Sequence, residues 1–328
     1  MLRSTGWSPE VAVVSADARA HREKGPVLAW ARDRGLVVDV GEEERLAAMR
    51  LEEFASDIVP AADAAQRDLT AQWAAFICLV DDRLDRSGLG SRPDEVRALF
   101  ARILRVLTQG GSADVRSGPE AALDDLWQRT APGMPPQWQE RFVADYRDFA
   151  AATCEEAAVR DDRARLALGD YLALRRRTIT ALPMATIVEC TADAPWPDLP
   201  GGDLRLKTLR MAAADVAGWS NDLASAEDDL RARQENLVTV WAREHGCPMS
   251  TARERVVDMR DNRLCDLQLL AAELTAGEGV PHSDRAAVRR YVNALRSFVS
   301  ATLLWLGATG RFEPRWTPDP HGAPTPLP

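Results

Sequence analysis

An apolar segment that ends in three carboxylates constrains this chain more than any other part of its sequence. Apolar side chains recur at helical spacing before the carboxylates, at Leu69, Trp73, Phe76, Ile77 and Val80. This spacing predicts a helix with one face in the protein core. Asp81 and Asp85 continue that face beyond Ile77, and Asp82 lies beside them. Carboxylates in such a place are costly unless a cation pairs with them.

The residues of this segment leave two interpretations open. Asp81, Asp82 and Asp85 offer hard oxygen ligands, which suit a Mg²⁺ ion that is shared with a substrate phosphate. Acidic residues also occur at solvated helix ends, and a short motif of this kind is not specific by itself. A second set of ligands elsewhere in the chain would favour the metal site.

Such a second set follows later in the sequence. Asn221, Ser225 and Asp229 are spaced four apart, so they would form one stripe on a helix. The same stripe runs back through apolar residues at 209, 213 and 217. An amide oxygen, a hydroxyl and a carboxylate could complete a Mg²⁺ shell with little excess charge. The alternative is a polar surface patch, which the apolar start of the stripe disfavours.

Together the two motifs resemble the metal motifs of bacterial class I terpene synthases, in both order and separation. In that family the motifs face each other across a cavity mouth and bind three Mg²⁺ ions, which hold the diphosphate of a linear isoprenoid. The resemblance covers most of the chain and implies an all-α, single-domain helical bundle around a central apolar cavity. Two positions depart from the family pattern. Asp229 stands where Glu is usual, and Asp228 stands where Lys is frequent.

Arginine residues extend the resemblance. Residues 171–178 resemble the segment with the diphosphate-sensing arginine, and the spacing to Asn221 selects Arg175 from three consecutive arginines. The family couples phosphate binding to ionisation at the positions of Thr178 and Ile179, so the resemblance gives these two residues and Arg175 catalytic roles. A guanidinium group can bind phosphate oxygens in a fork. The alternative for the three arginines is a solvated basic helix face.

Near the C-terminus, residues 305–312 resemble the closing Arg-Tyr pair of the family. Arg311 would then bind the diphosphate together with Arg175, whereas Phe312 lacks the usual tyrosine hydroxyl. A surface arginine after a helix is the alternative, because two glycines weaken helicity in this segment. The candidates for the wall of the cavity are Phe76, Ile77, Phe298 and Trp305. Aromatic rings there could stabilise a carbocation through their negative faces.

Composition sets limits on location and partners. A net charge of −9 argues against nucleic acid as a partner. Five scattered cysteines without a Cys-x-x-Cys pair favour a reducing, cytoplasmic location and argue against a zinc site. We find neither a signal peptide nor an apolar run long enough to span a bilayer. The expected partner is an isoprenyl diphosphate, and the family resemblance also allows a homodimer.

The sequence predicts helices between segments that are rich in the helix breakers Pro and Gly. The expected helices cover residues 43–58, 62–86, 92–108, 137–160, 165–183, 202–231, 235–246, 249–275 and 284–306. Only residues 35–40 look strand-like. No break is long enough for a domain linker, so we expect one domain over residues 1–312. Residues 313–328 are rich in Pro and Gly and are expected to form a mobile tail.

The resemblance therefore implies a Mg²⁺-dependent terpene cyclase, a carbon–oxygen lyase. It would ionise a linear diphosphate of fifteen or twenty carbons, cyclise the cation and release diphosphate. Three alternatives remain. A prenyl diphosphate synthase would normally carry two Asp-Asp-x-x-Asp motifs, whereas the second motif here is Asn/Ser/Asp. The others are a non-catalytic helical protein that binds isoprenoid diphosphates, and a helical scaffold with accidental motifs.

Overall fold

A computed structural model describes residues 25–86, 88–109, 117–197, 199 and 204–312. These residues are mostly helical, and none of them forms a β-strand. The α-helices are α1 (Pro26–Asp33), α2 (Val40–Met49), α3 (Leu51–Ile58), α4 (Ala64–Arg86), α5 (Pro93–Gln109), α6 (Pro119–Thr130), α7 (Pro136–Asp161), α8 (Leu168–Thr178), α9 (Ala181–Thr191), α10 (Leu204–Ala232), α11 (Leu237–His245), α12 (Met249–Ala276) and α13 (Arg285–Ala308). The described residues also form two short 3₁₀ turns, η2 (Leu89–Ser91) and η3 (Ala131–Gly133).

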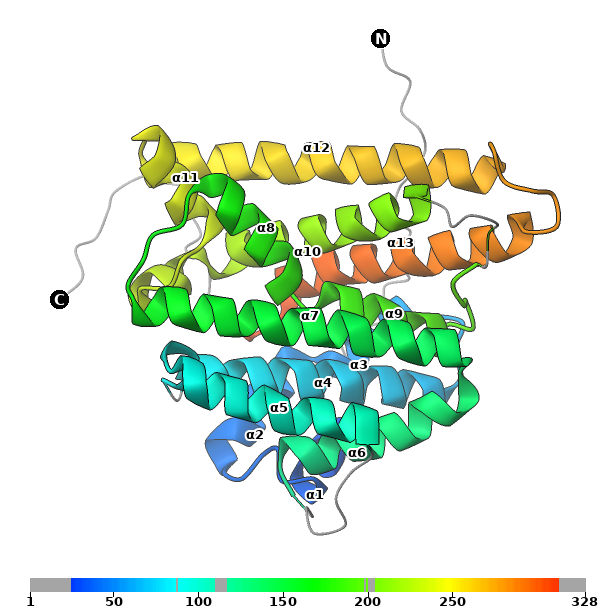
Figure 1. The fold of residues 1–328 in the computed structure, drawn as a ribbon, viewed down its shortest axis with the longest axis horizontal. Helices are drawn as coiled ribbons and strands as arrows, with labels where there is room; N and C mark the ends of the chain where they lie inside the picture. Colours follow the sequence, from blue (N-terminus) through cyan, green and yellow to red (C-terminus); the bar gives the residue numbers. More distant parts are fainter. Residues whose placement is uncertain (1–24, 87, 110–116, 198, 200–203, 313–328) are drawn as a thin grey trace, which may run out of the picture.

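The long helices lie side by side in layers (Figure 1). α12 forms one edge of the bundle, α10 and α13 lie next to it, and α4 and α5 lie on the other side of α7 and α9. α9 contacts α4, α7, α10 and α13. Its sequence is apolar on nearly every side, and all of its residues except Leu182 and Cys190 are buried. A helix that is apolar all round is stable only in the interior, so α9 forms the centre of the fold.

Seven of the expected helices are confirmed with ends within two residues. These are the helices expected over 62–86, 92–108, 137–160, 202–231, 235–246, 249–275 and 284–306. Three helices were not expected, namely α1, α6 and α9. The strand-like prediction for residues 35–40 is wrong. Most of this segment is the loop between α1 and α2, and no described strand exists to pair with it.

Two expected helices are each divided in the structure. The helix expected over 43–58 breaks at Arg50, whose φ of 56° is left-handed, and becomes α2 and α3. The helix expected over 165–183 ends at Thr178, and α9 begins after Thr180, which has a φ of 60°. Pro183 lacks an N–H and cannot donate to the carbonyl of Ile179 four residues before it. An α-helix therefore cannot keep its hydrogen-bond ladder across this point.

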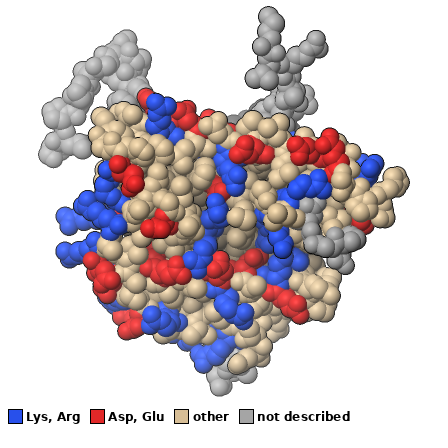
Figure 2. All heavy atoms as spheres, turned by 45° about the horizontal axis from the view of Figure 1, so that its top comes forward, with Lys and Arg blue, Asp and Glu red and all other residues tan. Residues whose placement is uncertain are grey.

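One large apolar core extends from α1 to α13, and a smaller cluster lies among α8, α10, α11 and α12. The expected tail at 313–328 lies outside the described residues. No described helix has the length and apolar character needed to cross a membrane. Acidic and basic side chains alternate over the face shown in Figure 2, so neither charge dominates it.

Candidate active site

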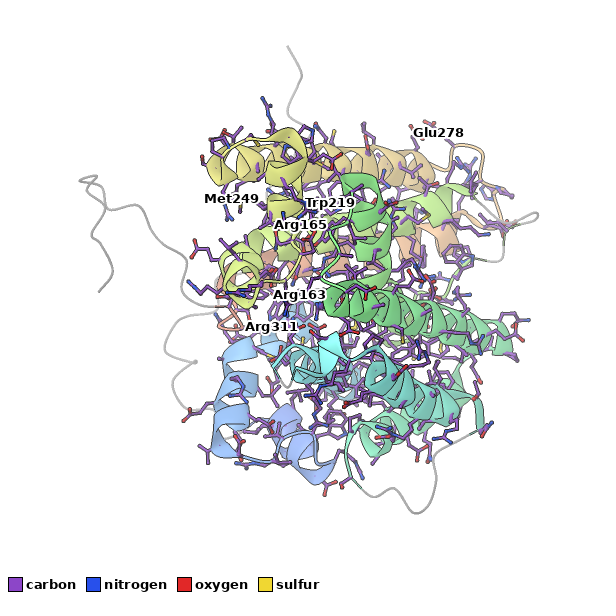
Figure 3. The ribbon with its side chains drawn as sticks, turned by 60° about the vertical axis from the view of Figure 1, so that its left-hand side comes forward. Arg163, Arg165, Trp219, Met249, Glu278 and Arg311 are labelled. Carbon is purple, nitrogen blue, oxygen red and sulfur yellow. The ribbon has the colours of Figure 1, made fainter. Side chains whose placement is uncertain are left out.

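The two predicted ligand sets meet at one cavity mouth. The C-terminal part of α4 supplies Asp81, Asp82 and Asp85, and the second half of α10 supplies Asn221, Ser225 and Asp229. All six side chains line a polar cavity of about 500 Å³, together with Arg175 and Arg311. Arg311 lies at the end of the molecule that comes forward in Figure 3. Two stripes distant in sequence therefore form a single oxygen-rich site.

Arg311 pairs with the first motif. Its Nη2 donates to Asp81 Oδ2 at 2.6 Å and to Asp82 Oδ1 at 2.8 Å, and its Nε donates to Asp82 Oδ1 at 3.2 Å. Only 12% of the Arg311 side chain is exposed. The interpretation as a loose surface arginine is therefore wrong. Its charge lies beside the first two carboxylates of the predicted metal motif.

Asp85 has a different cation, which sequence reasoning missed. Arg160 of α7 donates from Nη1 to Asp85 Oδ1 at 2.8 Å, and Gln234 Nε2 donates to the same atom at 3.0 Å. The Asp85 side chain is 34% exposed. Partial burial raises its pKa to about 6, the charge of Asp81 adds to this effect, and Arg160 opposes it. No local motif marks Arg160, because only packing of α7 against the rest of the bundle brings it to Asp85.

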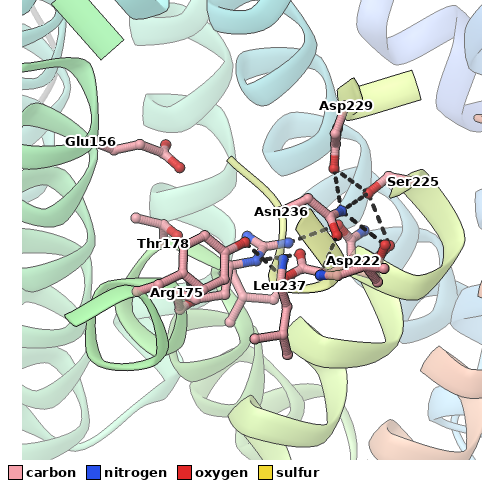
Figure 4. Close-up of polar contacts among 12 residues, drawn as sticks. Glu156, Arg175, Thr178, Asp222, Ser225, Asp229, Asn236 and Leu237 are labelled. Atoms are coloured by element: carbon pink, nitrogen blue, oxygen red, sulfur yellow. Dashed lines mark hydrogen bonds and ion pairs between the residues drawn. The ribbon is translucent and has the colours of Figure 1, made fainter. Parts of the chain in front are cut away.

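The second motif is organised by the start of α11. Ser225 Oγ donates to Asp229 Oδ2 at 2.6 Å, and Asn236 Nδ2 donates to the same atom at 2.7 Å (Figure 4). Asn236 is fully buried and also caps α11 by accepting from the N–H of Val238. Burial raises the pKa of Asp229, while the hydrogen bonds from Ser225 and Asn236 lower it. Asn236 thus aligns a predicted ligand, and sequence reasoning missed it.

Arg175 is fixed by a buried carboxylate. Its Nε donates to Asp222 Oδ1 at 2.7 Å and its Nη2 donates to Asn221 Oδ1 at 2.8 Å (Figure 4). Asp222 is 2% exposed and also accepts from the Tyr171 hydroxyl at 2.8 Å and from the N–H of Leu237. The two neighbouring arginines instead pair elsewhere, Arg176 with Asp215 and Arg177 with Asp148 and Glu155. The family resemblance, with its spacing to Asn221, therefore selected the arginine of the three that reaches the cavity.

Thr178 and Ile179 lie at the break between α8 and α9, and both line the inner cavity. The carbonyl of Ile179 accepts from the Thr180 hydroxyl. No backbone N–H of the described residues donates to it, since Pro183 has none. The break thus leaves a polar carbonyl outside the helical ladders at the junction of the polar mouth and the apolar interior.

The inner cavity is narrower, about 100 Å³, and mostly apolar. Ile77, Phe298 and Trp305 line it, as expected, but Phe76 does not. Phe76 is fully buried and packs edge-to-face against Trp73, with ring centroids 6.2 Å apart. The ring of Phe76 therefore takes part in core packing and does not reach the cavity. The lining residues that sequence reasoning missed include Phe54, Cys78, Ala181, Met184, Thr302 and Leu306.

The donor chemistry of the mouth fits a hard divalent ion. Every predicted ligand is an oxygen, and Ser225 and Asp229 already lie within hydrogen-bond distance. No three His, Cys, Asp or Glu side chains in the described part of the chain are grouped so as to hold an ion by themselves. Mg²⁺ usually keeps water ligands and takes phosphate oxygens as well. The six side chains are therefore suited to a metal that is bound together with a phosphate group.

Comparison with known proteins agrees with this arrangement. The family model described as terpene synthase family 2, C-terminal metal binding, matches residues 72–266. The chain is 30% identical to pristinol synthase of Streptomyces pristinaespiralis over 302 residues, which cover 90% of this chain and 81% of that one. This chain belongs to the terpene synthase family. The matched residues contain both motifs and Arg175, so this terpene synthase carries its candidate ligands within the family's metal-binding region.

Two further proteins are similar along nearly the whole length of this terpene synthase. It is 30% identical to (−)-β-caryophyllene synthase of Saccharothrix espanaensis, over 87% of this chain and 82% of that one. The solved structure of germacradien-4-ol synthase from Streptomyces citricolor superposes with a TM-score of 0.73 at 26% identity, and covers 86% of this chain and 92% of that chain. The expectation of an all-α terpene synthase fold is confirmed.

Proposed function

We propose that this terpene synthase cyclises the fifteen-carbon farnesyl diphosphate to a sesquiterpene and releases diphosphate as a carbon–oxygen lyase. The observation that carries this proposal is the convergence of six candidate oxygen ligands and two arginines at one polar mouth. This mouth adjoins the apolar inner cavity, and the two share several lining residues. Diphosphate would bind at the mouth, and the hydrocarbon chain would extend inward.

The names of relatives favour fifteen carbons over twenty. The similar (−)-β-caryophyllene synthase is described as cyclising (2E,6E)-farnesyl diphosphate. So is the (+)-T-muurolol synthase of Roseiflexus castenholzii, which is 26% identical over 88% of this chain.

The arginines and the two ligand sets of the mouth have defined tasks in this proposal. Arg175 and Arg311 would donate charge-assisted hydrogen bonds to phosphate oxygens. The two ligand sets would hold Mg²⁺, with three ions expected, and these ions would neutralise charge on the departing diphosphate. Asp222 would keep the Arg175 guanidinium in its orientation, since it accepts from Nε at 2.7 Å. The Ile179 carbonyl offers a negative dipole at the point where positive charge develops.

The apolar interior would protect the cation after ionisation. Phe298 and Trp305 present aromatic rings to the cavity, and Ile77 and Met184 add apolar surface. Ring faces attract cations, and exclusion of water prevents premature quenching. Loss of a proton would then give a hydrocarbon, and capture of water would give an alcohol.

Asp228, which stands where the family often has Lys, is not an isolated charge at the mouth. Asp228 accepts from Arg231 Nη1 at 2.6 Å, so this acidic side chain has a cationic neighbour on the same helix. This pairing reduces the repulsion that a carboxylate would otherwise exert on diphosphate. It removes one objection to diphosphate binding at the mouth, which an active enzyme requires.

The test is incubation with linear C10, C15, C20 and C25 diphosphates and Mg²⁺, followed by analysis of volatile products. We expect one or more cyclic C15 products, which disappear with a chelator and in an Asp81→Asn variant. Asp94→Asn is the matched control, because Asp94 lies on the surface of α5, where 96% of its side chain is exposed. Chain elongation when isopentenyl diphosphate is added as a co-substrate, or no turnover of any substrate, would contradict the proposal.

A further inference from the structure

The C-terminal end of α13 is attached to the junction between α2 and α3. The indole N–H of Trp305 donates to the Met49 carbonyl at 2.6 Å, and the N–H of Gly310 donates to the Ala48 carbonyl at 2.9 Å. The Thr309 hydroxyl also donates to the Met49 carbonyl, at 3.3 Å. We call these three contacts the C-terminal dock. They join segments from the two ends of the described chain.

The dock satisfies carbonyl groups that α2 leaves open. α2 ends at Met49 because Arg50 is left-handed, and α3 begins at the next residue. The last carbonyls of a helix have no donor within that helix. Met49 is 1% exposed, so water has little access to its carbonyl. A buried carbonyl without a donor is unfavourable, and Trp305 and Thr309 supply donors.

Gly310 permits this close approach. A Cβ atom at position 310 would lie 3.1 Å from both the carbonyl oxygen and the Cβ of Ala48, which is tighter than nine in ten real Cβ contacts. At Gly307, one turn earlier on the same segment, an added Cβ would meet no atom within 4 Å. The two glycines therefore differ in function. Gly310 lets two backbones meet, while Gly307 faces open space.

Arg311 follows the dock directly. Its backbone N–H donates to the Thr309 hydroxyl at 3.2 Å, and its guanidinium reaches Asp81 and Asp82. We infer that the α2–α3 junction positions Arg311 for diphosphate binding, with Thr309 and Gly310 as positioning residues. This inference rests on the proposed function, because it concerns how Arg311 is presented to the same site. The first described helices thus contribute to the site without supplying a ligand.

The test measures binding of inorganic pyrophosphate with Mg²⁺ by calorimetry on the full chain. Gly310→Val should weaken binding about tenfold, as expected when one charge-assisted contact is misplaced. Gly307→Val is the matched control and should bind as wild type does. In an Arg311→Ala background, Gly310→Val should have no further effect, because both changes remove the same contact. Independent, additive losses would overturn the inference.

A milder pair of variants protects the test against misfolding. Thr309→Val removes the hydroxyl that links Met49 to the N–H of Arg311, while Thr309→Ser keeps it. We expect weaker pyrophosphate binding in the first and near-normal binding in the second. If wild type binds no pyrophosphate, the proposed function itself fails. If wild type binds but Gly310→Val and Thr309→Val bind equally well, only the dock's role fails.

Discussion

Asp222→Asn offers the sharpest test of how the cavity mouth is built. The change keeps the shape of the side chain but removes the charge that faces Arg175. Asp222 is 2% exposed and the Arg175 side chain 15%, so water can replace little of the lost interaction. Removal of one partner from a buried ion pair costs about 3–5 kcal/mol. We expect about 2–4 kcal/mol here, because an amide oxygen can still accept from Arg175 or Tyr171.

Thermal and denaturant unfolding would measure this cost. For a chain of this size, a loss of about 2–4 kcal/mol corresponds to a decrease in Tm of about 3–6 °C. Asp228→Asn is the matched control on the same helix, because 32% of that side chain is exposed and its ion pair with Arg231 lies near the surface. Such a pair is worth about 0–1 kcal/mol.

The same variant should affect binding more than its stability loss explains. Arg175 would lose the acceptor that orients its Nε, so pyrophosphate affinity should fall at temperatures where the variant is fully folded. Calorimetry with Mg²⁺ and pyrophosphate would measure this. The reasoning is refuted if Asp222→Asn is no less stable than Asp228→Asn, or if a folded Asp222→Asn variant binds pyrophosphate as wild type does.

Three further outcomes are expected. Asp81→Asn should lower turnover at least about a hundredfold, because it removes a predicted metal ligand. The circular dichroism spectrum should be unchanged. Turnover at the wild-type rate would exclude Asp81 from the metal site. Asp229→Ala should raise the Mg²⁺ concentration for half-maximal turnover about tenfold or more, whereas Asp229→Glu should retain activity. Burial raises the pKa of Asp85 to about 6, so a proton on this carboxylate should compete with Mg²⁺ as the pH falls below 6. The Mg²⁺ concentration for half-maximal turnover should then rise by up to about tenfold per pH unit. A requirement that is constant from pH 7 to pH 5 would contradict this.

Helical periodicity predicted the two ligand sets because ligands and core residues share one stripe on each helix. Asp81 and Asp85 follow Ile77 on α4, and Asn221, Ser225 and Asp229 follow an apolar stripe on α10. A regular helix fixes the direction of each side chain from its position in the sequence. Most helix ends were predictable for a different local reason, because Pro and Gly residues interrupt the helical pattern there.

The partners of these ligands could not be predicted in this way. Arg160 reaches Asp85 from α7, and Asn236 reaches Asp229 from the start of α11. Neither belongs to a motif, and each depends on how two helices pack. Phe76 was misplaced for a related reason, because periodicity shows that a face is buried but not whether it meets a cavity or another helix.

The sequence by itself thus determined the helical class and predicted the candidate ligands, because both depend on local geometry that repeats every few residues. Only the tertiary structure decided which cation meets each carboxylate and how Arg311 is held against α2. Those features depend on contacts between residues far apart in the chain, such as Gly310 and Ala48. Packing of the whole bundle, not any short segment, fixes such contacts.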